Sequence, residues 1–359
     1  MKRVVIADLR STASNGTTMG HYFAVADNYC NVLGEKNVMV AGGPLYKKKY
    51  KQLVELPYNT YKTENPLLRW LKVLCNAKKL FNQCAEDIIV LQCSAVAASY
   101  MGTFLFKKRK TKLFLIQYNT LGLDSKLKKV LYSLVREKID GVICPEEEIG
   151  KAYHDNYCIV PDYIYTEGQQ ERNLIDYDNK KYDFAMVGLI CKDKGIIEAA
   201  QKLQGTKYHV VIAGFPQTED IREQLEAISK ECNNIEVVPK YLSEEAYAGY
   251  INNSKYCILN YSGAYSEHSS GVVFDVLFRG TPVVGRSCKS LDFIKEYNLG
   301  YIFMDINEWN PDSVFNKKKY KEYLTAISSY YKTHLNYQTK LRKFLNLGDT
   351  SNELSKMDI

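Results

Sequence analysis

The most informative segment of the chain is Tyr265-Ser-Glu-His-Ser-Ser-Gly-Val-Val-Phe-Asp-Val-Leu-Phe-Arg-Gly-Thr-Pro-Val-Val284. It follows a short apolar run at Tyr256–Leu259, passes through small residues and continues with apolar residues at helical spacing. It then turns at Gly280-Thr281-Pro282 into a second apolar run. A strand, a helix and another strand in this order form a βαβ unit, which predicts a parallel sheet.

The same alternation extends over most of the chain. In the carboxy-terminal half, strands are expected at Asp183–Val187, His209–Ala213, Ile235–Val238, Tyr256–Leu259, Pro282–Val284 and Tyr301–Met304. Helices are expected near Gly195–Gln204, Asp220–Glu231, Glu244–Asn253, Gly271–Arg279 and Leu291–Tyr297, and a polar helix near 318–345. In the first 165 residues, strands are expected at Arg3–Ala7, Asn37–Ala41, Asp87–Gln92, Lys112–Gln117, Gly141–Cys144 and Cys158–Val160, and helices near Met19–Leu33, Pro66–Cys84, Ala95–Phe106 and Ser125–Lys138.

These two series predict an α/β protein with two Rossmann-like domains, at 1–165 and 182–345, that face each other across a cleft. The stretch 166–181 is polar and aperiodic, so we interpret it as a linker. The terminal helices are assigned to the second domain, and 346–359 is expected to be a polar tail. In such folds ligands bind at the carboxyl ends of the strands.

Composition excludes several classes of protein. With 359 residues, 46% hydrophobic and 25% charged, the chain is neither disordered nor a small disulfide-stapled domain. The ten cysteines never form C-x-x-C, so we expect reduced thiols. No signal peptide or membrane span is evident, which predicts a cytoplasmic protein. The 29 tyrosines come without an RNA-binding signature, so nucleic acid is not an expected partner.

Small residues and a carboxylate stand together at the start of the helix near 271. Ser269, Ser270 and Gly271 open this helix, whose unpaired backbone N–H groups and dipole favour a phosphate. Asp275 lies one turn further along the same helix face. A carboxylate beside a phosphate suits sugar hydroxyls rather than the anion itself.

The pattern Glu267-x7-Asp275, followed by Gly-Thr-Pro-Val-Val at 280–284, resembles the signature of family-four glycosyltransferases. These are retaining enzymes of the GT-B fold that use nucleotide sugars. The resemblance implies that Glu267 faces the donor sugar, that Asp275 holds the ribose and that His268 lies beside the sugar pocket. It also implies a diphosphate site at Ser269, Ser270, Gly271 and Val272. The family has Glu where this chain has Asp275, which reaches one methylene less far.

A second stretch, Val187-Gly-Leu-Ile-Cys-Lys-Asp-Lys-Gly195, resembles the first loop of the family's second domain. The resemblance implies that Gly188 and Lys194 line the donor phosphates, with Lys194 stabilising the leaving diphosphate. The family's arginine is absent at Leu189. Either Lys192 or a residue of the first domain replaces it, or the leaving diphosphate is stabilised less strongly. Tyr241 lies where the family often contacts the base. The alternative for Lys194 is a solvated lysine at a helix start.

In the first domain, Ser14–Gly20 stands where the family has a glycine-rich loop, which implies donor contacts from Gly16 and Thr17. His21 is a candidate acceptor residue or a helix-capping residue. The family often has a histidine after a central strand of the first domain, where this chain has none at 116–122. The resemblance therefore implies that Asn119 or Tyr118 orients the acceptor. Asp176-Tyr177-Asp178 is a D-x-D motif, which binds a metal-complexed donor in a different glycosyltransferase fold. Here it lies in the polar linker rather than at the end of an apolar strand, so we expect neither a metal nor another cofactor.

The positive charge is concentrated in the first half. Residues 1–160 carry a net charge of +10 and residues 161–359 a net charge of −3. Basic clusters occur at 47–51, 107–110 and 126–129, and the helix at Pro66–Cys84 mixes leucines with cations. This pattern predicts peripheral contact with an anionic inner membrane. A core helix with a solvated basic face is the alternative.

The sequence thus predicts a metal-independent retaining hexosyltransferase that uses a UDP-linked sugar. Its expected acceptor is a lipid-linked glycan or a growing surface polysaccharide such as lipopolysaccharide or capsule. Two alternatives stay open: a non-catalytic sugar-binding partner subunit, and a nucleotide-sugar epimerase of the same fold. The small number of histidines, five in the chain, argues against the epimerase.

Overall fold

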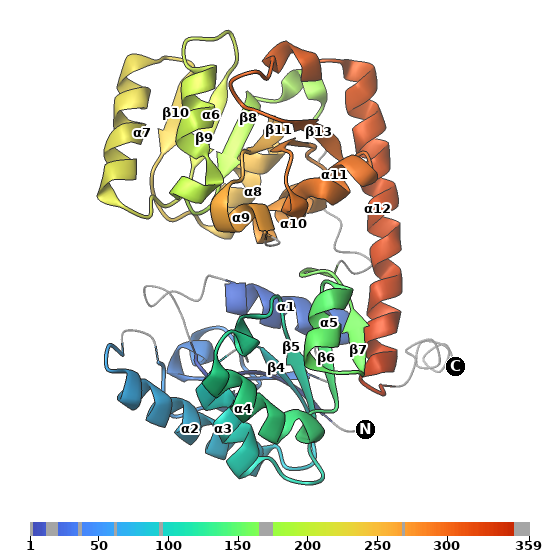
Figure 1. The fold of residues 1–359 in the computed structure, drawn as a ribbon. Helices are drawn as coiled ribbons and strands as arrows, with labels where there is room; N and C mark the ends of the chain where they lie inside the picture. The colour runs from blue at the N-terminus through green and yellow to red at the C-terminus, as the bar shows by residue number, and fades with distance from the viewer. Residues whose placement is uncertain are drawn as a thin grey trace. The chain divides into compact units, whose positions relative to one another are not determined.

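The chain forms two α/β units, each built on one parallel sheet (Figure 1). The computed structural model describes residues 3–11, 21–34, 38–60, 63–92, 96–164, 175–267 and 270–347. One unit comprises Met1–Thr166 with Leu335–Ile359, and the other comprises Glu167–His334. The predicted fold class, two parallel sheets with interleaved helices, is confirmed.

The sheet of the first unit has seven parallel strands in the order β3-β2-β1-β4-β5-β6-β7. Its strands are β1 (Val4–Asp8), β2 (Val38–Gly42), β3 (Leu53–Glu55), β4 (Ile88–Gln92), β5 (Lys112–Ile116), β6 (Gly141–Cys144) and β7 (Tyr157–Ile159). Its helices are α1 (His21–Leu33), α2 (Pro66–Gln83), α3 (Ala97–Phe106), α4 (Lys126–Val135) and α5 (Glu147–Tyr153). The strand order reverses between β1 and β4, where such sheets open a crevice for ligands.

Alternating strand residues build one core on each face of this sheet. Val5 and Ala7 contribute to the core under α2, α3 and α4. Val4 and Ile6 contribute to the core under α1, which the end of the terminal helix also enters through Leu341. Both strand faces are apolar because helices cover both sides, and this explains the continuous apolar runs in the sequence.

The sheet of the second unit has six parallel strands in the order β10-β9-β8-β11-β12-β13. Its strands are β8 (Tyr182–Val187), β9 (Val210–Ala213), β10 (Ile235–Val238), β11 (Ser254–Leu259), β12 (Val283–Arg286) and β13 (Gly300–Phe303). Its helices are α6 (Ile196–Leu203), α7 (Glu219–Glu231), α8 (Glu244–Asn252), α9 (Gly263–Glu267), α10 (Gly271–Phe278) and α11 (Asp292–Glu296). Here the order reverses between β8 and β11.

The last helix, α12 (Lys317–Phe344), begins in the second unit and ends in the first. Near its middle, the Tyr331 hydroxyl donates to the Phe278 carbonyl at 3.3 Å. Beyond it, Gln338 Nε2 donates to the Val32 carbonyl at 2.9 Å and Arg342 Nη1 to the Leu33 carbonyl at 3.0 Å. These donors satisfy the last carbonyls of α1. The assignment of the whole terminal helix to the second domain therefore needs correction, because its last part packs on the first unit.

Three short elements were not expected from the sequence. Strand β3 has three residues at the sheet edge, and α5 and α9 have seven and five residues. Segments this short show too few apolar repeats to give a period. The helix expected at Ser125–Lys138 is an α-helix only to Val135 and continues as a 3₁₀ turn over Arg136–Lys138.

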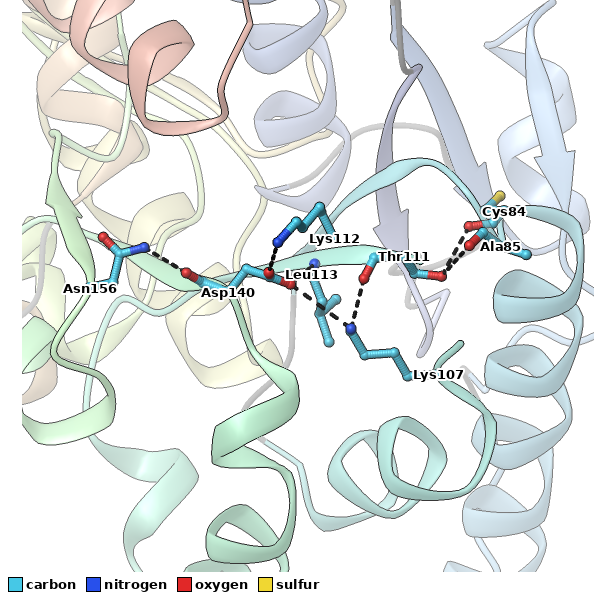
Figure 2. Close-up of polar contacts among 8 residues, drawn as sticks. All are labelled: Cys84, Ala85, Lys107, Thr111, Lys112, Leu113, Asp140 and Asn156. Atoms are coloured by element: carbon cyan, nitrogen blue, oxygen red, sulfur yellow. Dashed lines mark hydrogen bonds and ion pairs between the residues drawn. The ribbon is translucent and has the colours of Figure 1, made fainter. Parts of the chain in front are cut away.

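A polar cluster joins the amino-terminal ends of β5 and β6 (Figure 2). Asp140 accepts from Lys112 Nζ at 2.7 Å and from the Leu113 N–H at 2.8 Å. Its second oxygen lies 3.9 Å from Nζ of Lys107, a buried lysine that donates to the Thr111 carbonyl at 2.7 Å. Lys107, the first residue of the basic cluster at 107–110, therefore stabilises the fold.

Candidate functional site

Two loops meet at the carboxyl ends of β8 and β11. After β8, the chain turns through Gly188, makes a 3₁₀ turn at Lys192–Lys194 and enters α6 through Gly195. Gly195 is left-handed, with φ 58°, and a Cβ there would stand 2.3 Å from the Asn260 carbonyl oxygen. Asn260, directly after β11, donates from Nδ2 to the Gly195 carbonyl at 3.0 Å. Only glycine allows this approach, which fixes the start of α6 against β11.

Lys194 is buried in this turn, with 5% of its surface exposed. Its Nζ lies 5.2 Å from the centroid of the Tyr265 ring. The same Nζ would lie 3.6 Å from a Cβ atom added at Gly188. Burial lowers the pKa of this ammonium group. Within the described part of the chain, Nζ makes no hydrogen bond or ion pair. The alternative of a solvated lysine is therefore excluded.

Helix α10 begins beside the same turn. Ser270 is buried at its amino terminus, where its hydroxyl lies 2.8 Å from that of Tyr261. Gly271 is exposed, and Val272 Cγ2 would lie 3.3 Å from a Cβ at Gly188. The bare edge of Gly188 therefore adjoins both Lys194 and the first turn of α10. The structure thus brings together four residues that the sequence singled out: Gly188, Lys194, Gly271 and Val272.

Asp275 lies one turn into α10 and is partly buried. Its Oδ2 accepts from the Tyr247 hydroxyl of α8 at 3.3 Å. Burial raises the pKa of this carboxyl to about 6, although Arg279, Tyr247 and Lys194 act in the opposite direction and Glu244 adds to the rise. The site thus combines a buried cation with a carboxyl group that changes charge near neutral pH.

Other predicted donor residues surround this centre with more exposure. Glu267 ends α9 and is exposed, as is Lys192. Leu189, at the place of the missing arginine, is 39% exposed. Tyr241 is 45% exposed and stacks on Phe215, with ring centroids 4.0 Å apart and planes at 16°. His268 and Ser269 lie outside the described residues.

Five residues of this site were not predicted from the sequence: Asn260, Tyr261, Tyr265, Tyr247 and Phe215. Phe215 had a usable signal, because it follows β9 as Tyr241 follows β10. The three other tyrosines had none, since this chain has 29 tyrosines at many positions.

The remaining predicted site residues belong to the first unit, whereas Lys194 and Asp275 belong to the second. Gly16 and Thr17 lie outside the described residues. His21 is the first residue of α1, and its side chain is likewise outside them. The hydroxyl of Tyr118 is buried, which raises its pKa. Asn119 accepts through Oδ1 from the Leu121 N–H at 2.9 Å, so in this structure it stabilises a turn after β5.

A buried carboxylate at the end of β1 was also missed. Asp8 is fully buried and accepts through Oδ1 from the Ser11 N–H at 2.9 Å and the Arg10 N–H at 3.0 Å. The Tyr46 hydroxyl donates to its Oδ2 at 2.8 Å, while burial raises the pKa of this carboxyl. Asp8 therefore holds the start of the loop after β1. An acid at the end of the apolar run Val4–Asp8 was the available signal.

The described residues hold neither a cluster of metal-ligating side chains nor a helix that could span a membrane. No group of three or more His, Cys, Asp or Glu side chains could hold a metal there. Within the linker motif, Asp178 pairs with Lys317 at 2.7 Å. No described helix is both long and apolar enough to cross a bilayer. Nine of the ten cysteines are described, and these nine are free thiols.

Comparisons with known proteins place the fold. No protein family model matches the sequence, and the search of curated proteins gives no match. Among solved structures, an α,α-trehalose-phosphate synthase (UDP-forming) from Burkholderia xenovorans is similar, with TM-score 0.69 and 10% identity, over 96% of this chain and 100% of that one. HepE from Anabaena, solved with UDP, is similar with TM-score 0.64 and 10% identity, over 96% and 99% of the two chains. AviGT4, a glycosyltransferase involved in avilamycin A biosynthesis, is similar with TM-score 0.62 and 12% identity, over 96% and 97%. The chain has the two-domain α/β fold of these GT-B glycosyltransferases.

Proposed function

We propose that this protein is a retaining glycosyltransferase that moves a hexose-type sugar from a UDP-linked donor to a glycan acceptor. The observation that carries the proposal is the buried ammonium group of Lys194 beside Gly188 and the first turn of α10. A buried cation without an ion-pair partner in the described part of the chain is costly, so its retention favours an anionic ligand.

The donor diphosphate suits this position chemically. Its negative charge would be met by the Lys194 ammonium and by the unpaired N–H groups that open α10. Charge on the diphosphate grows as the bond to the sugar breaks, so the same groups stabilise the transition state more than the bound donor.

A nucleotide also accounts for the groups around the diphosphate site. Asp275 can accept hydrogen bonds from ribose hydroxyls when its carboxyl is ionised, and Glu267 is proposed to face the donor sugar. The exposed Tyr241 ring, stacked on Phe215, offers an apolar face to a base. Uridine is the preferred base because the similar HepE structure contains UDP and the similar trehalose-phosphate synthase is UDP-forming.

We propose that the reaction needs no protein nucleophile. The acceptor hydroxyl oxygen bonds to the anomeric carbon on the face that the leaving diphosphate vacates. The bond from that carbon to the diphosphate oxygen breaks, and the diphosphate takes the hydroxyl proton. Lys194 and Glu267 then position and stabilise the reacting groups, while no metal and no other cofactor is required.

The acceptor is proposed to be a lipid-linked glycan or a surface polysaccharide, with the enzyme in the cytoplasm. The basic first half favours an anionic acceptor. A sugar phosphate is the second candidate, because the similar Burkholderia xenovorans enzyme was solved with glucose-6-phosphate.

Thermal-shift titration of the full chain with UDP, GDP, ADP and CMP tests the donor site. UDP should raise the melting temperature most. The UDP affinity obtained from the titration should fall at least about tenfold in Lys194→Ala and in Asp275→Ala. Lys230→Ala, an exposed lysine on α7, is the matched control. Failure of UDP and GDP to stabilise the protein, with Asp275→Ala neutral, would refute the donor site.

Turnover separates an enzyme from a non-catalytic subunit. Hydrolysis or transfer from a panel of UDP-sugars is measured with and without EDTA, and NMR identifies the anomer of the product. The proposal predicts EDTA-resistant turnover with a retained anomer. Nucleotide binding without turnover across donors and acceptors would favour the non-catalytic subunit instead.

A further inference from the structure

An apolar surface lies uncovered on helices α2, α3 and α4 of the first unit. In the fold, α3 packs between the other two (Figure 1). Six large apolar side chains of these helices are 49–71% exposed: Leu67, Leu71, Leu105, Leu127, Val130 and Leu134. The exposed large apolar residues of the second unit, such as Leu189 and Met304, are scattered over separate elements. We call the exposed side of these three helices the α2–α4 surface.

The exposed leucines do not belong to the stripe that packs on the sheet. Helix α4 buries Leu131, Tyr132 and Val135 in the core, whereas Leu127, Val130 and Leu134 form a second row on its exposed side. Spacings of three and four residues align such a row along the helix. Core packing therefore leaves this apolar row without a partner in the described part of the chain.

The same helices carry only positive charge. Their sequences contain seven lysines and arginines and no aspartate or glutamate. By contrast, α7 of the second unit contains five acids and two basic residues. Lys78, Lys79, Lys126 and Lys129 are exposed and make no ion pair within the described residues. Unpaired cations thus stand on α2 and α4, the two helices that carry five of the six exposed apolar side chains.

Other basic clusters are partly neutralised. Lys47 pairs with Glu55 at 3.1 Å, Lys49 with Asp27, and Lys110 with Glu86 at 2.8 Å. Lys107 is buried beside Asp140 (Figure 2). Lys48, Lys51, Lys108 and Arg109 of these clusters are exposed and make no ion pair within the described residues. The α2–α4 surface differs from both clusters because its unpaired lysines stand on helices that also expose large apolar side chains.

We propose that the α2–α4 surface binds the face of an anionic phospholipid bilayer. Apolar side chains on one side of a helix enter the acyl boundary, while lysines beside them reach the phosphate groups. Each basic residue near such a surface contributes about 1 kcal/mol of attraction, so four free lysines make a substantial difference between anionic and neutral lipid. This inference goes beyond the proposed donor chemistry and does not depend on it.

Cosedimentation of the full chain with vesicles tests the proposal. One set contains phosphatidylcholine with about one third phosphatidylglycerol, and the other contains phosphatidylcholine alone. The protein should bind the anionic vesicles at least about tenfold more tightly, and added salt should weaken this binding. Equal binding to both sets, or binding to neither, would overturn the proposal.

Two sets of substitutions separate the apolar and ionic parts. The triple variant Leu127→Ser, Val130→Ser, Leu134→Ser removes the apolar row, and Lys78→Gln, Lys79→Gln, Lys129→Gln removes free charge. Each should weaken binding to anionic vesicles at least about tenfold. Met304→Ser and the triple variant Lys230→Gln, Lys295→Gln, Lys332→Gln change exposed residues of the second unit and should bind as the unaltered protein does.

Further measurements keep the outcomes distinct. Melting curves and UDP thermal shifts of every variant should match those of the unaltered protein, so failure of the donor site would be seen separately. Sedimentation analysis tests the competing occupant, a second copy of this chain. A dimer that the apolar triple variant dissociates, without any vesicle binding, would assign the surface to self-association and refute the membrane proposal.

Discussion

The Tyr247 hydroxyl donates a hydrogen bond of 3.3 Å to Oδ2 of Asp275, which joins α8 to α10 at the candidate donor site. Burial raises the pKa of Asp275 to about 6, while the hydrogen bond and Arg279 favour its ionised form. The Asp275 carboxyl group therefore changes its charge near pH 6. Both stability and donor binding should depend on pH for this reason.

Asp275→Asn should stabilise the fold at pH 7.5 but not at pH 4. Because the folded-state pKa exceeds the unfolded value of about 3.9, the folded protein holds this proton more tightly and loses stability as pH rises from about 4 to 6. The substitution removes that cost, worth about 1–3 kcal/mol above pH 6. Denaturant unfolding at both pH values measures the effect. Glu245→Gln, an exposed acid on α8, is the control, and an equal effect of Asp275→Asn at both pH values would contradict the prediction.

Tyr247→Phe should shift the pH dependence of UDP binding. Loss of the hydroxyl removes a group that favours the Asp275 carboxylate, so the pKa rises further above its usual range. On the proposed function, the ionised carboxyl holds the ribose, and the midpoint of UDP affinity moves to higher pH. Calorimetric titration from pH 5 to 8 checks this. An unchanged midpoint would show that Asp275 does not control the affinity.

Lys194→Met should preserve or raise the melting temperature while it abolishes most turnover. Methionine fills a similar volume and removes the cost of a buried ammonium, whose pKa burial lowers. Loss of one transition-state cation is expected to reduce kcat by about 10²- to 10³-fold. Lys230→Met serves as the control for charge alone. Undiminished kcat in Lys194→Met would remove Lys194 from the mechanism.

Gly195→Ala should destabilise the second unit far more than Gly205→Ala. Both glycines have positive φ, 58° and 67°. Alanine at either position would therefore adopt the left-handed conformation, which is unfavourable by roughly 1 kcal/mol. Only at Gly195 would the new Cβ also clash, 2.3 Å from the Asn260 carbonyl oxygen, whereas nothing lies within 4 Å at Gly205. A difference of at least about 2 kcal/mol in the free energy of unfolding is expected. Similar losses at the two positions would show that the contact with Asn260 relaxes.

Asp140→Ala should lower the free energy of unfolding by about 2–4 kcal/mol. The substitution leaves the buried Lys107 without its carboxylate and the Leu113 N–H without its acceptor. Glu86→Ala breaks the exposed pair with Lys110 and should lower the free energy of unfolding far less, because solvent screens both charges. Chemical denaturation of both variants makes the comparison. Equal costs would mean that the cluster in Figure 2 contributes no more than a surface ion pair.

The regular elements could be predicted because their signal is local. The apolar run of β8 and the amphipathic spacing of α7 are visible in a few consecutive residues, and the structure agrees to within one or two residues. Asp275 could be placed beside the start of α10 from helix spacing, whereas Gly188 and Lys194 were singled out only by the resemblance to a glycosyltransferase loop. The support from Tyr247 and Asn260 could not be predicted, since each comes from a different βα segment.

The two α/β halves, their opposite net charges and the order of chemical groups at the strand ends can all be read along the chain. Which of the charged side chains are available to a ligand depends on the folded structure. It buries Lys194 and Lys107, pairs Lys49 and Lys110, and leaves Lys78 and Lys129 exposed. Every lysine has the same charge in the sequence, but its pKa, its partner and its access to a ligand depend on neighbours that folding brings together from distant positions.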